Sequence, residues 1–329
     1  MPGDPAQMML GQNEDSSQLA IVKHKYGFDK PIGTQYLYYL NDVSPISLHS
    51  NEPDNYTFLK QGKYSAVSLF SMGNTTFVLK FPYLRESFTK QGKKVSQVLA
   101  ETLPNTFVLA TTAIIIALLL GICLGIVSAL FKDQWLDKII QIFSTFGMSI
   151  PSFFSAILFA WFFGYVLHKY THLEMTGSLY EMDDFGEAMH IQWKNLILPA
   201  IVLGIRPLAV VIQLMRNSLL EVFNQDYIRT ARSKGLSEFQ IIKKHAVKNA
   251  MNPVVTAISG WFASMLAGAV FVEFIFGWNG LGKEIVNALN TLDLPVIMGS
   301  VLIIALLFII INIFVDIIYA WLDPKVKLE

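Results

Sequence analysis

Long apolar stretches without charged residues constrain this chain more than any other feature. Four stretches carry no charge, and a fifth contains only Arg206: residues 107–131, 139–167, 249–272, 294–315 and, with that one charge, 195–215. A helix of about 20 apolar residues crosses the roughly 30 Å hydrocarbon core of a bilayer. Only 15% of the residues are charged and 53% are hydrophobic, whereas an average soluble domain carries about 25% charge. The sequence therefore predicts an all-α integral membrane protein, a polytopic helical bundle with five spans.

Charge distribution predicts how these spans are oriented. Residues 216–248 hold seven basic and three acidic residues, whereas residues 168–194 hold five acidic and two basic ones. Because short cytoplasmic loops are enriched in Lys and Arg, residues 216–248 are expected in the cytoplasm and residues 168–194 outside. Five spans then place the polar N-terminal region, residues 1–104, outside the cell and the tail, residues 323–329, inside.

The loop at residues 224–252 has the form of two short helices around a glycine. The first helix is predicted over residues 226–233, and Gly235 tolerates the left-handed conformation that ends a helix. Ser237 and Gln240 form a capping-box pattern that starts the second helix. That helix is expected to place three apolar side chains on one side: Phe239, Ile242 and Ala246. Such a hairpin suits either the groove of a partner protein or an anionic lipid surface, and the residues alone leave both open.

The same loop resembles the EAA loop, the signature of permeases of binding-protein-dependent ABC transporters. Arg229, Thr230 and Ala231 take the positions of the EAA residues, and Gly235 takes that of the motif glycine. Other segments resemble the dipeptide/oligopeptide branch in order and spacing: Pro-Gly-Asp-Pro at residues 2–5, Ser149-Ile-Pro-Ser-Phe153, Phe276-Gly-Trp-Asn-Gly-Leu-Gly282 and Leu322-Asp-Pro324. The resemblance covers about residues 1–43 and 77–329.

The resemblance implies the type I permease fold of ABC importers, which normally has six spans. The first of these lies just before the Pro-Gly-Asp-Pro motif, so we expect this sequence to lack that helix, which would export residues 1–104. Residues 44–76 are longer than the usual first outer loop and are expected to form an extracytoplasmic insertion. The permease domain is expected at residues 105–322, with spans at about 105–131, 139–167, 195–215, 250–273 and 294–319.

Partners and cofactors follow from the same resemblance. It implies a homologous second permease subunit, two ABC ATPase subunits and an extracytoplasmic solute-binding protein, assembled in the bacterial inner membrane. ATP and Mg²⁺ are expected in the ATPase subunits, with no cofactor in this chain. A peptide substrate is implied, with nickel or another small solute as the alternative within the family. No nucleic-acid partner is expected from a net charge of zero.

The loop residues expected to couple ATPase motion to the spans are Arg229, Thr230, Ala231, Gly235, Leu236, Ser237, Phe239 and His245. Two further charges lie within or beside spans, where charged groups tend to face a bundle interior or a water-filled cavity. Arg206 is expected to line the cavity or to pair with another subunit. Glu273 is expected to hold the outer gate or to cap a turn.

No catalytic or metal site is expected in this chain. Residues 277–284 almost match the phosphate-binding pattern G-x4-G-K-[ST], but Glu284 replaces the hydroxyl that would bind Mg²⁺. His168 and His172 are four residues apart, yet no zinc motif surrounds them. The single Cys123 excludes an internal disulfide. Two alternatives from other classes are a stand-alone channel or secondary carrier, which would show an inverted repeat, and a membrane enzyme.

Overall fold

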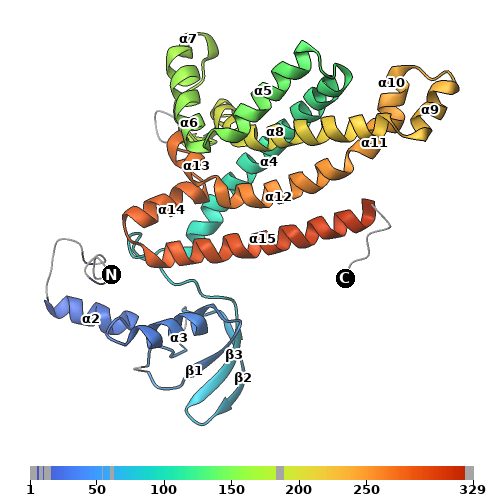
Figure 1. Ribbon diagram of the computed structural model, residues 1–329. Coiled ribbons are helices and arrows are strands. Elements are labelled where there is room, and N and C mark those ends of the chain that lie inside the picture. The colour runs from blue at the N-terminus through green and yellow to red at the C-terminus, as the bar shows by residue number, and fades with distance from the viewer. Residues whose placement is uncertain are drawn as a thin grey trace. The chain divides into compact units, whose positions relative to one another are not determined.

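The computed structural model describes residues 6, 10, 16–53, 55–59, 63–182 and 189–322 (Figure 1). The chain divides into two compact units, one formed by Met1–Glu101 with Ile285–Leu302 and the other by Thr102–Glu284 with Ile303–Glu329. The expected cytoplasmic tail and the Pro-Gly-Asp-Pro motif lie outside the described residues, as do residues 183–188 of the acidic loop.

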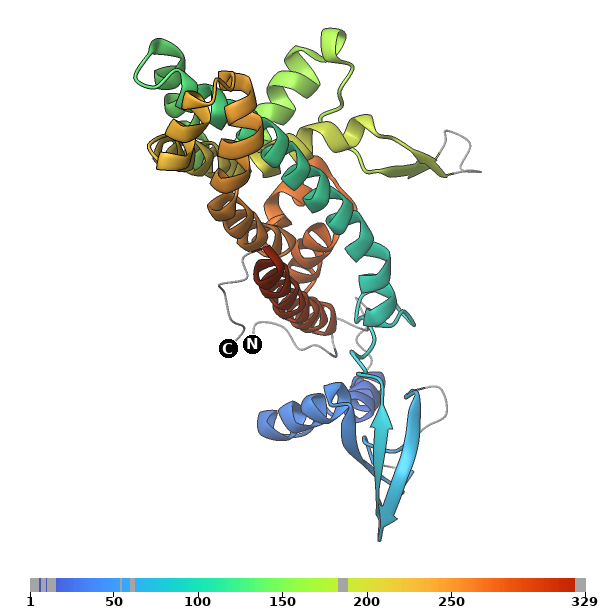
Figure 2. The ribbon, with the colours of Figure 1, turned by 90° about the vertical axis from the view of Figure 1, so that its right-hand side faces the viewer.

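The first unit combines two helices with a small antiparallel sheet. The elements that lie wholly within it are α2 (Ser16–Tyr26), α3 (Ile32–Val43), β1 (Ile46–Ser50), β2 (Ala66–Met72) and β3 (Thr75–Lys80). The strand order is β1-β3-β2, and α2 and α3 lie on one side of the sheet (Figure 2). Strands β2 and β3 are joined by the two-residue turn 73–74, whose glycine has φ +60°, as hairpin turns of this length require. The expected insertion, residues 44–76, therefore supplies β1 and β2 to this sheet.

The faces of this sheet are inverted relative to an ordinary soluble sheet. The buried side of β1 and β3 is largely polar and includes Ser47, His49 and Lys80, while Leu48 and Leu79 are exposed. The polar side is satisfied by a network around Asp42, which is fully buried. Its carboxylate accepts hydrogen bonds from Tyr56 Oη (2.8 Å), Tyr64 Oη (2.7 Å) and Arg85 Nε (2.9 Å). Paired in this way, a buried charge can be retained.

Helices of 4 to 36 residues make up the second unit, and the first and the last two of them have part of their residues in the first unit. They are α4 (Val95–Leu130), α5 (Trp135–Ser149), α6 (Ser152–Trp161), α7 (His168–Thr171), α8 (Lys194–Phe223), α9 (Asp226–Ser233), α10 (Glu238–Ile241), α11 (Val247–Ala250), α12 (Asn252–Gly268), α13 (Val270–Phe276), α14 (Leu281–Asn290) and α15 (Leu294–Leu322). A short hairpin, β4 (Tyr180–Met182) with β5 (Met189–Ile191), precedes α8. Helix α8 contacts α5, α6, α11, α12 and α13, so it is the central element of this unit. The helical bundle confirms the predicted fold class, although neither small sheet was expected.

Among the described residues, three helices are long and apolar enough to cross a membrane, and the number rises to five if each of two bent pairs counts as one span. The three are Val95–Leu130, Lys194–Phe223 and Leu294–Val315. The bent pairs are Trp135–Ser149 with Ser152–Val166, which meet at 110°, and Asn252–Leu266 with Val270–Phe276, which meet at 57°. The five segments overlap the predicted spans, although Val95–Leu130 and Lys194–Phe223 extend beyond the predicted bounds 105–131 and 195–215, and residues 139–167 do not form one straight helix. Pro151 explains the break, because it holds the preceding Ile150 in an extended conformation.

Small residues allow α4 to lie directly against α8. A Cβ atom added to Gly121 would lie 2.6 Å from Val211 Cγ1, and one added to Gly125 would lie 2.7 Å from Met215 Cβ. Two glycines four residues apart are the arrangement that lets membrane helices approach closely. One side of α8 therefore packs closely against α4, and its other sides contact α5, α6 and α12.

A buried ion pair joins α5 to α8. Arg216 on α8 donates to both carboxylate oxygens of Asp137 on α5, at 2.8 and 2.7 Å. The same carboxylate accepts hydrogen bonds from Ser128 Oγ and from the backbone N–H of Asp133. Because both partners are well over half buried, removing either one would leave an uncompensated charge.

Candidate functional site

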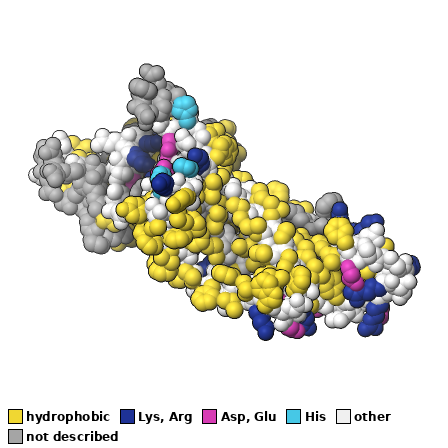
Figure 3. Space-filling model, turned by 90° about the horizontal axis from the view of Figure 1, so that it is seen from above, with side chains coloured by type: hydrophobic (Ala, Val, Ile, Leu, Met, Phe, Trp, Pro, Cys, Tyr) yellow, Lys and Arg dark blue, Asp and Glu magenta, His cyan; other side chains and the backbone are white. Residues whose placement is uncertain are grey.

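The predicted hairpin is present and follows α8 directly. We call residues 224–252 the basic hairpin. Helix α9 covers residues 226–233 as the sequence predicts, and the second arm consists of α10, a π-helical turn at Ile242–Ala246, and α11. Figure 3 shows Lys and Arg side chains gathered at the end of the second unit where these elements lie, beyond a largely hydrophobic surface. The hairpin is therefore a basic projection at the end of the central helix.

Two local devices set the shape of the basic hairpin. Gly235 has φ +76°, and a Cβ atom added to it would meet no other atom within 4 Å, so backbone conformation alone selects glycine there. Ser237 and Gln240 form the predicted capping box, in which each side chain accepts a hydrogen bond from the other residue's backbone N–H. An ion pair between Arg232 and Glu238, at 2.9 Å, links the two arms. The turn geometry is therefore fixed within the hairpin itself.

The second arm does not place the three expected apolar side chains on one side. Ile241, Ala246 and Ala250 are fully buried, whereas Phe239 is 71% exposed. The π-helical turn causes the difference, because its wider ring adds a residue between Ile241 and Ala246 and shifts which side chains share a face. The expected apolar side of Phe239, Ile242 and Ala246 is therefore wrong, and Phe239 belongs to the outer surface.

The eight predicted coupling residues divide into inner and outer positions. Ala231 is 6% exposed and belongs to the hydrophobic core with Ile228 and Ile241, so it supports the hairpin from inside. Leu236 and His245 are half-buried. The exposed members are Arg229, Thr230, Gly235, Ser237 and Phe239. An aromatic ring beside basic side chains thus forms the outer surface, with Lys243 Nζ 6.0 Å from the ring centroid of Phe239.

Arg206 lies near the middle of α8, is exposed in this chain, and lines a small cavity of about 90 Å³. Side chains from α6 and α12 share the lining, including Ser152, Ser155, Trp261 and Ser264. Within the described part of the chain, no hydrogen bond or ion pair involves the Arg206 guanidinium. The cavity therefore combines a cation with several hydroxyl groups among residues of α5, α6, α8 and α12.

Glu273 caps a turn, which is one of its two predicted roles. Its side chain is fully buried, and Oε2 accepts hydrogen bonds from the backbone N–H groups of Gly282 (2.7 Å) and Lys283 (3.2 Å) at the start of α14. A helix N-terminus favours an anion at this position. The Glu273 carboxylate thus binds the backbone N–H groups that a phosphate would need. The glycines and lysine at residues 277–284 therefore belong to a turn capped by Glu273 and not to a phosphate site.

The segment 276–282 packs against the first part of α4, a role that its sequence did not reveal. Trp278 Nε1 donates to the carbonyl of Asn105 at 3.0 Å, and the backbone N–H of Leu281 donates to Thr106 Oγ1 at 2.8 Å. Gly277 ends α13 in the left-handed conformation with φ +68°. The glycines and the buried tryptophan of this motif therefore build a tight turn. No signal in the isolated sequence pairs it with residues 105–106.

The structure offers no support for a metal site at the paired histidines. His168 Nδ1 lies 2.8 Å from the carbonyl of Leu173, and His172 ends α7 with φ +53°. Across the described ranges, no cluster of three or more His, Cys, Asp or Glu side chains is arranged to hold a metal ion.

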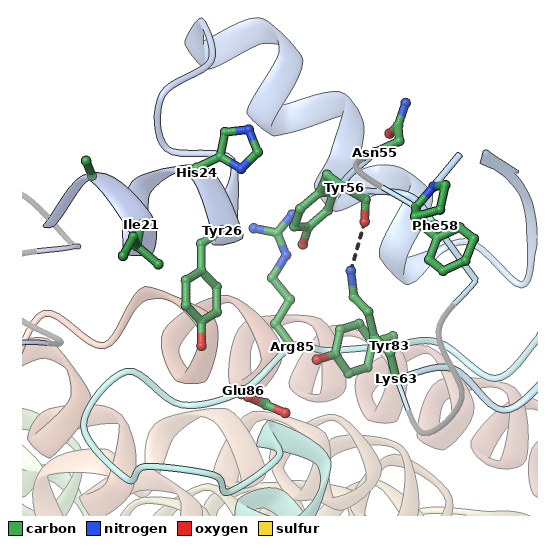
Figure 4. Close-up of a pocket in the computed structure, with 12 residues that line it drawn as sticks. Ile21, His24, Tyr26, Asn55, Tyr56, Phe58, Lys63, Tyr83, Arg85 and Glu86 are labelled. Carbon is green, nitrogen blue, oxygen red and sulfur yellow. Dashed lines mark hydrogen bonds between the residues drawn. The ribbon is translucent and has the colours of Figure 1, made fainter. Parts of the chain in front are cut away.

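A larger cavity, about 750 Å³, lies within the first unit (Figure 4). Its lining combines aromatic and charged side chains, namely Tyr26, Tyr56, Lys63, Tyr83, Arg85 and Glu86. Lys63 Nζ donates to the carbonyl of Tyr56 at 3.1 Å and lies 4.0 Å from its ring centroid. Burial, and then the neighbouring Asp42 carboxylate, raises the pKa of Tyr56, which stays protonated. Sequence reasoning placed no site here.

Comparison with known proteins agrees with this architecture. The family model described as binding-protein-dependent transport system inner membrane component matches residues 121–328, and its N-terminal companion matches residues 1–51. The chain belongs to this family. It is therefore a multi-pass inner-membrane permease of an ABC importer and not an enzyme, which sets aside the stand-alone carrier and membrane-enzyme alternatives. The family implies partner components that hydrolyse ATP and bind the substrate.

Individual relatives and solved structures extend the comparison. The chain is 31% identical to the dipeptide transport system permease protein DppB of Alkalihalophilus pseudofirmus, covering 99% of this chain and 91% of that protein. It is also 31% identical to the glutathione transport system permease protein GsiC of Salmonella typhimurium, covering 99% and 90%. An inward-facing MetNI methionine ABC transporter shares the fold, with a TM-score of 0.53 and 15% identity over 69% of this chain and 97% of the solved chain. An amino acid ABC transporter with histidines matches with a TM-score of 0.51, at 14% identity over 68% and 94%.

Proposed function

We propose that this chain forms half of the translocation pathway of a peptide-importing ABC transporter. It would pair with a homologous second permease subunit, and two ATPase subunits would bind ATP and Mg²⁺ on the cytoplasmic side. An extracytoplasmic solute-binding protein would deliver the peptide. Relatives named for dipeptide and glutathione transport support a short peptide as the substrate.

The observation that carries the proposal is the basic hairpin at the end of α8. Its outer surface would lie in a groove of an ATPase subunit, where exposed Phe239 supplies an apolar anchor and Arg229 a charge. The turn is fixed internally by Gly235 and the capping box, and its inner face packs into the same core as α8. If ATP binding displaced the hairpin, the hairpin would therefore move as a rigid unit and α8 would move with it. Since α8 contacts the neighbouring helices of the bundle, its movement would open the pathway alternately to each side.

The test uses the assembled transporter in proteoliposomes with its binding protein and a labelled dipeptide. Gly235→Val forces a β-branched residue into a left-handed conformation, which costs about 1–2 kcal/mol and distorts the turn. We expect roughly a tenfold or greater loss of peptide-stimulated ATP hydrolysis and of uptake, with normal membrane insertion. Gly92→Val is the matched control, because Gly92 also has a positive φ (+72°) and open space around it but lies outside the hairpin.

Three outcomes would contradict parts of the proposal. Normal coupling in Gly235→Val would remove the hairpin from the mechanism. An equal loss in Gly92→Val would show that the effect is one of general stability. Uptake of nickel but not of any peptide by the wild-type assembly would replace the peptide with the alternative substrate.

A further inference from the structure

Arg206 is too deep in α8 to reach water at either end of that helix. Twelve residues separate it from the start of α8 at Lys194 and seventeen from the end at Phe223, which correspond to about 18 and 25 Å of helix. An extended arginine side chain cannot span either distance. A cation in the middle of a span is costly unless it faces water or a counter-charge. The residues around Arg206 should therefore show which of the two it faces.

The cavity around Arg206 mixes hydroxyl groups with apolar side chains, and its lining holds no counter-charge. The cavity lining that it shares includes three serines, Ser152, Ser155 and Ser264, and no Asp or Glu. No described residue accepts a hydrogen bond from its guanidinium, in contrast to Arg216 on the same helix, which is paired with Asp137. The two arginines of α8 therefore differ. Arg216 is held in an ion pair within the chain, whereas the N–H groups of the Arg206 guanidinium have no acceptor among the described residues.

A proline follows Arg206 and leaves a backbone carbonyl of α8 without its helical donor. Pro207 has no backbone N–H, so the carbonyl of Leu203, four residues earlier and itself in the lining, receives no helical hydrogen bond from residue 207. The lining therefore brings together a guanidinium and hydroxyl groups, with Trp261 beside them. These groups match a peptide end, in which a carboxylate and amide N–H and C=O groups lie close together.

We propose that Arg206 binds a carboxylate of the transported peptide in this cavity, with the serine hydroxyl groups as additional donors. The inference rests on the proposed peptide transport and specifies where within the permease the peptide is recognised. Arginine suits this role because its planar donors match a carboxylate with two parallel hydrogen bonds. The volume of about 90 Å³ accommodates only the terminal group, so the rest of the peptide would lie in the space closed by the second permease subunit.

A carboxylate could reach Arg206 from the peptide or from an acidic residue of the second permease subunit, and the experiment separates the two. Uptake of a labelled dipeptide and of the same dipeptide with an amidated C-terminus is measured in proteoliposomes with the assembled transporter. The chain is compared as wild type, Arg206→Gln and Arg206→Lys. Lys194→Gln is the control, because it removes an exposed charge from the start of the same helix.

We expect the wild type to transport the free acid with a KM roughly tenfold below that of the amide, a difference of about 1.4 kcal/mol. Arg206→Gln should raise the KM for the acid to that of the amide while changing kcat little. Arg206→Lys should retain part of the discrimination, since it keeps the charge but loses the paired donors. Lys194→Gln should behave as the wild type.

Equal transport of acid and amide by the wild type would overturn the inference while leaving peptide transport in place. Loss of both substrates to the same degree in Arg206→Gln and Arg206→Lys would also overturn it, because it would indicate an acidic residue of the second subunit as the partner. Failure of the wild type to transport either peptide, with ATP hydrolysis intact, would overturn the proposed function and this inference together.

Discussion

Glu273 and the glycines around it show how single residues fix the turn before α14. The carboxylate is buried, and two backbone N–H groups at the helix start hold one of its oxygens. Such a position needs close approach of the backbone. A Cβ atom on Gly280 would lie 2.6 Å from Glu273 Cδ, and one on Gly282 would lie 2.5 Å from Val270 Cα. Glycine at these positions is therefore a packing requirement.

Gly282→Ala should destabilise the permease. The added methyl group would meet backbone at Val270 and the fixed carboxylate of Glu273, neither of which can rotate away. We expect a loss of about 1–3 kcal/mol in the free energy of unfolding, as for other overpacked cores. Thermal unfolding of the purified chain in detergent measures it.

Gly33→Ala is the matched control for that substitution. Gly33 lies in α3 with nothing within 4 Å of its added Cβ, so the change should be neutral or stabilising by less than about 1 kcal/mol. Equal melting temperatures for wild type and Gly282→Ala would show that the turn can relax around a methyl group.

At the scale of elements, the sequence predicted what local chemistry decides. The limits of α9 follow from Gly235, and the start of α10 follows from Ser237, because both act within a few residues. The π-helical turn at Ile242–Ala246 has no such local marker, so the face containing Phe239 was predicted wrongly. Likewise, Pro151 indicates a break between α5 and α6, but the 110° angle depends on packing against α8 and other helices.

The partners of the site residues were less predictable than the elements themselves. The role of Glu273 depends on contacts to residues 282–283, and that of Trp278 depends on residue 105, which is 173 positions away in the sequence. The hairpin of β2 and β3 was missed although its signals are local. Its strands are rich in β-branched and aromatic residues, and Gly73 and Asn74 form a two-residue turn between them.

Strand β1 carries a pH-sensitive residue in the polar core of the first unit. His49 is fully buried, with Nδ1 2.7 Å from the carbonyl of Thr57 and Nε2 3.0 Å from Ser47 Oγ. Burial lowers the pKa of His49; the hydrogen bond to the Thr57 carbonyl offsets part of this shift, and the nearby Lys80 adds to it. As the pH falls below about 6.5, its ordinary value, the unfolded chain therefore takes up the proton before the folded one does.

We predict that acidification weakens this sheet. Hydrogen-exchange protection factors of β1 and β3, measured on the full chain and corrected for intrinsic exchange, should fall between about pH 7 and pH 5. His49→Gln should reduce this dependence, whereas His24→Gln, at an exposed position of the same unit, should leave it unchanged. An undiminished pH dependence in His49→Gln would assign it to another group.

At the scale of the whole molecule, the uneven distribution of charge is the feature that predicts orientation. Seven basic residues lie at positions 216–248, and one of them, Arg216, forms the ion pair with Asp137. The other six belong to the basic hairpin, where Arg229, Arg232 and Lys234 are exposed. Because the positive-inside rule counts basic residues in short loops, the asymmetry persists without Arg216.

The single cysteine makes this orientation directly testable. In a Cys123→Ala background, Lys234→Cys in the basic hairpin, Lys169→Cys in α7 and Ser68→Cys in β2 each add one exposed thiol. A membrane-impermeant maleimide should label positions 169 and 68 in spheroplasts, and position 234 only in inside-out vesicles. Labelling of position 234 in intact spheroplasts would place the hairpin outside, where no ATPase subunit could reach it, and would contradict the orientation and the coupling role at once. If position 68 alone were labelled from the cytoplasmic side, the orientation of the bundle would stand, and the first unit would have to lie on the same side as the hairpin.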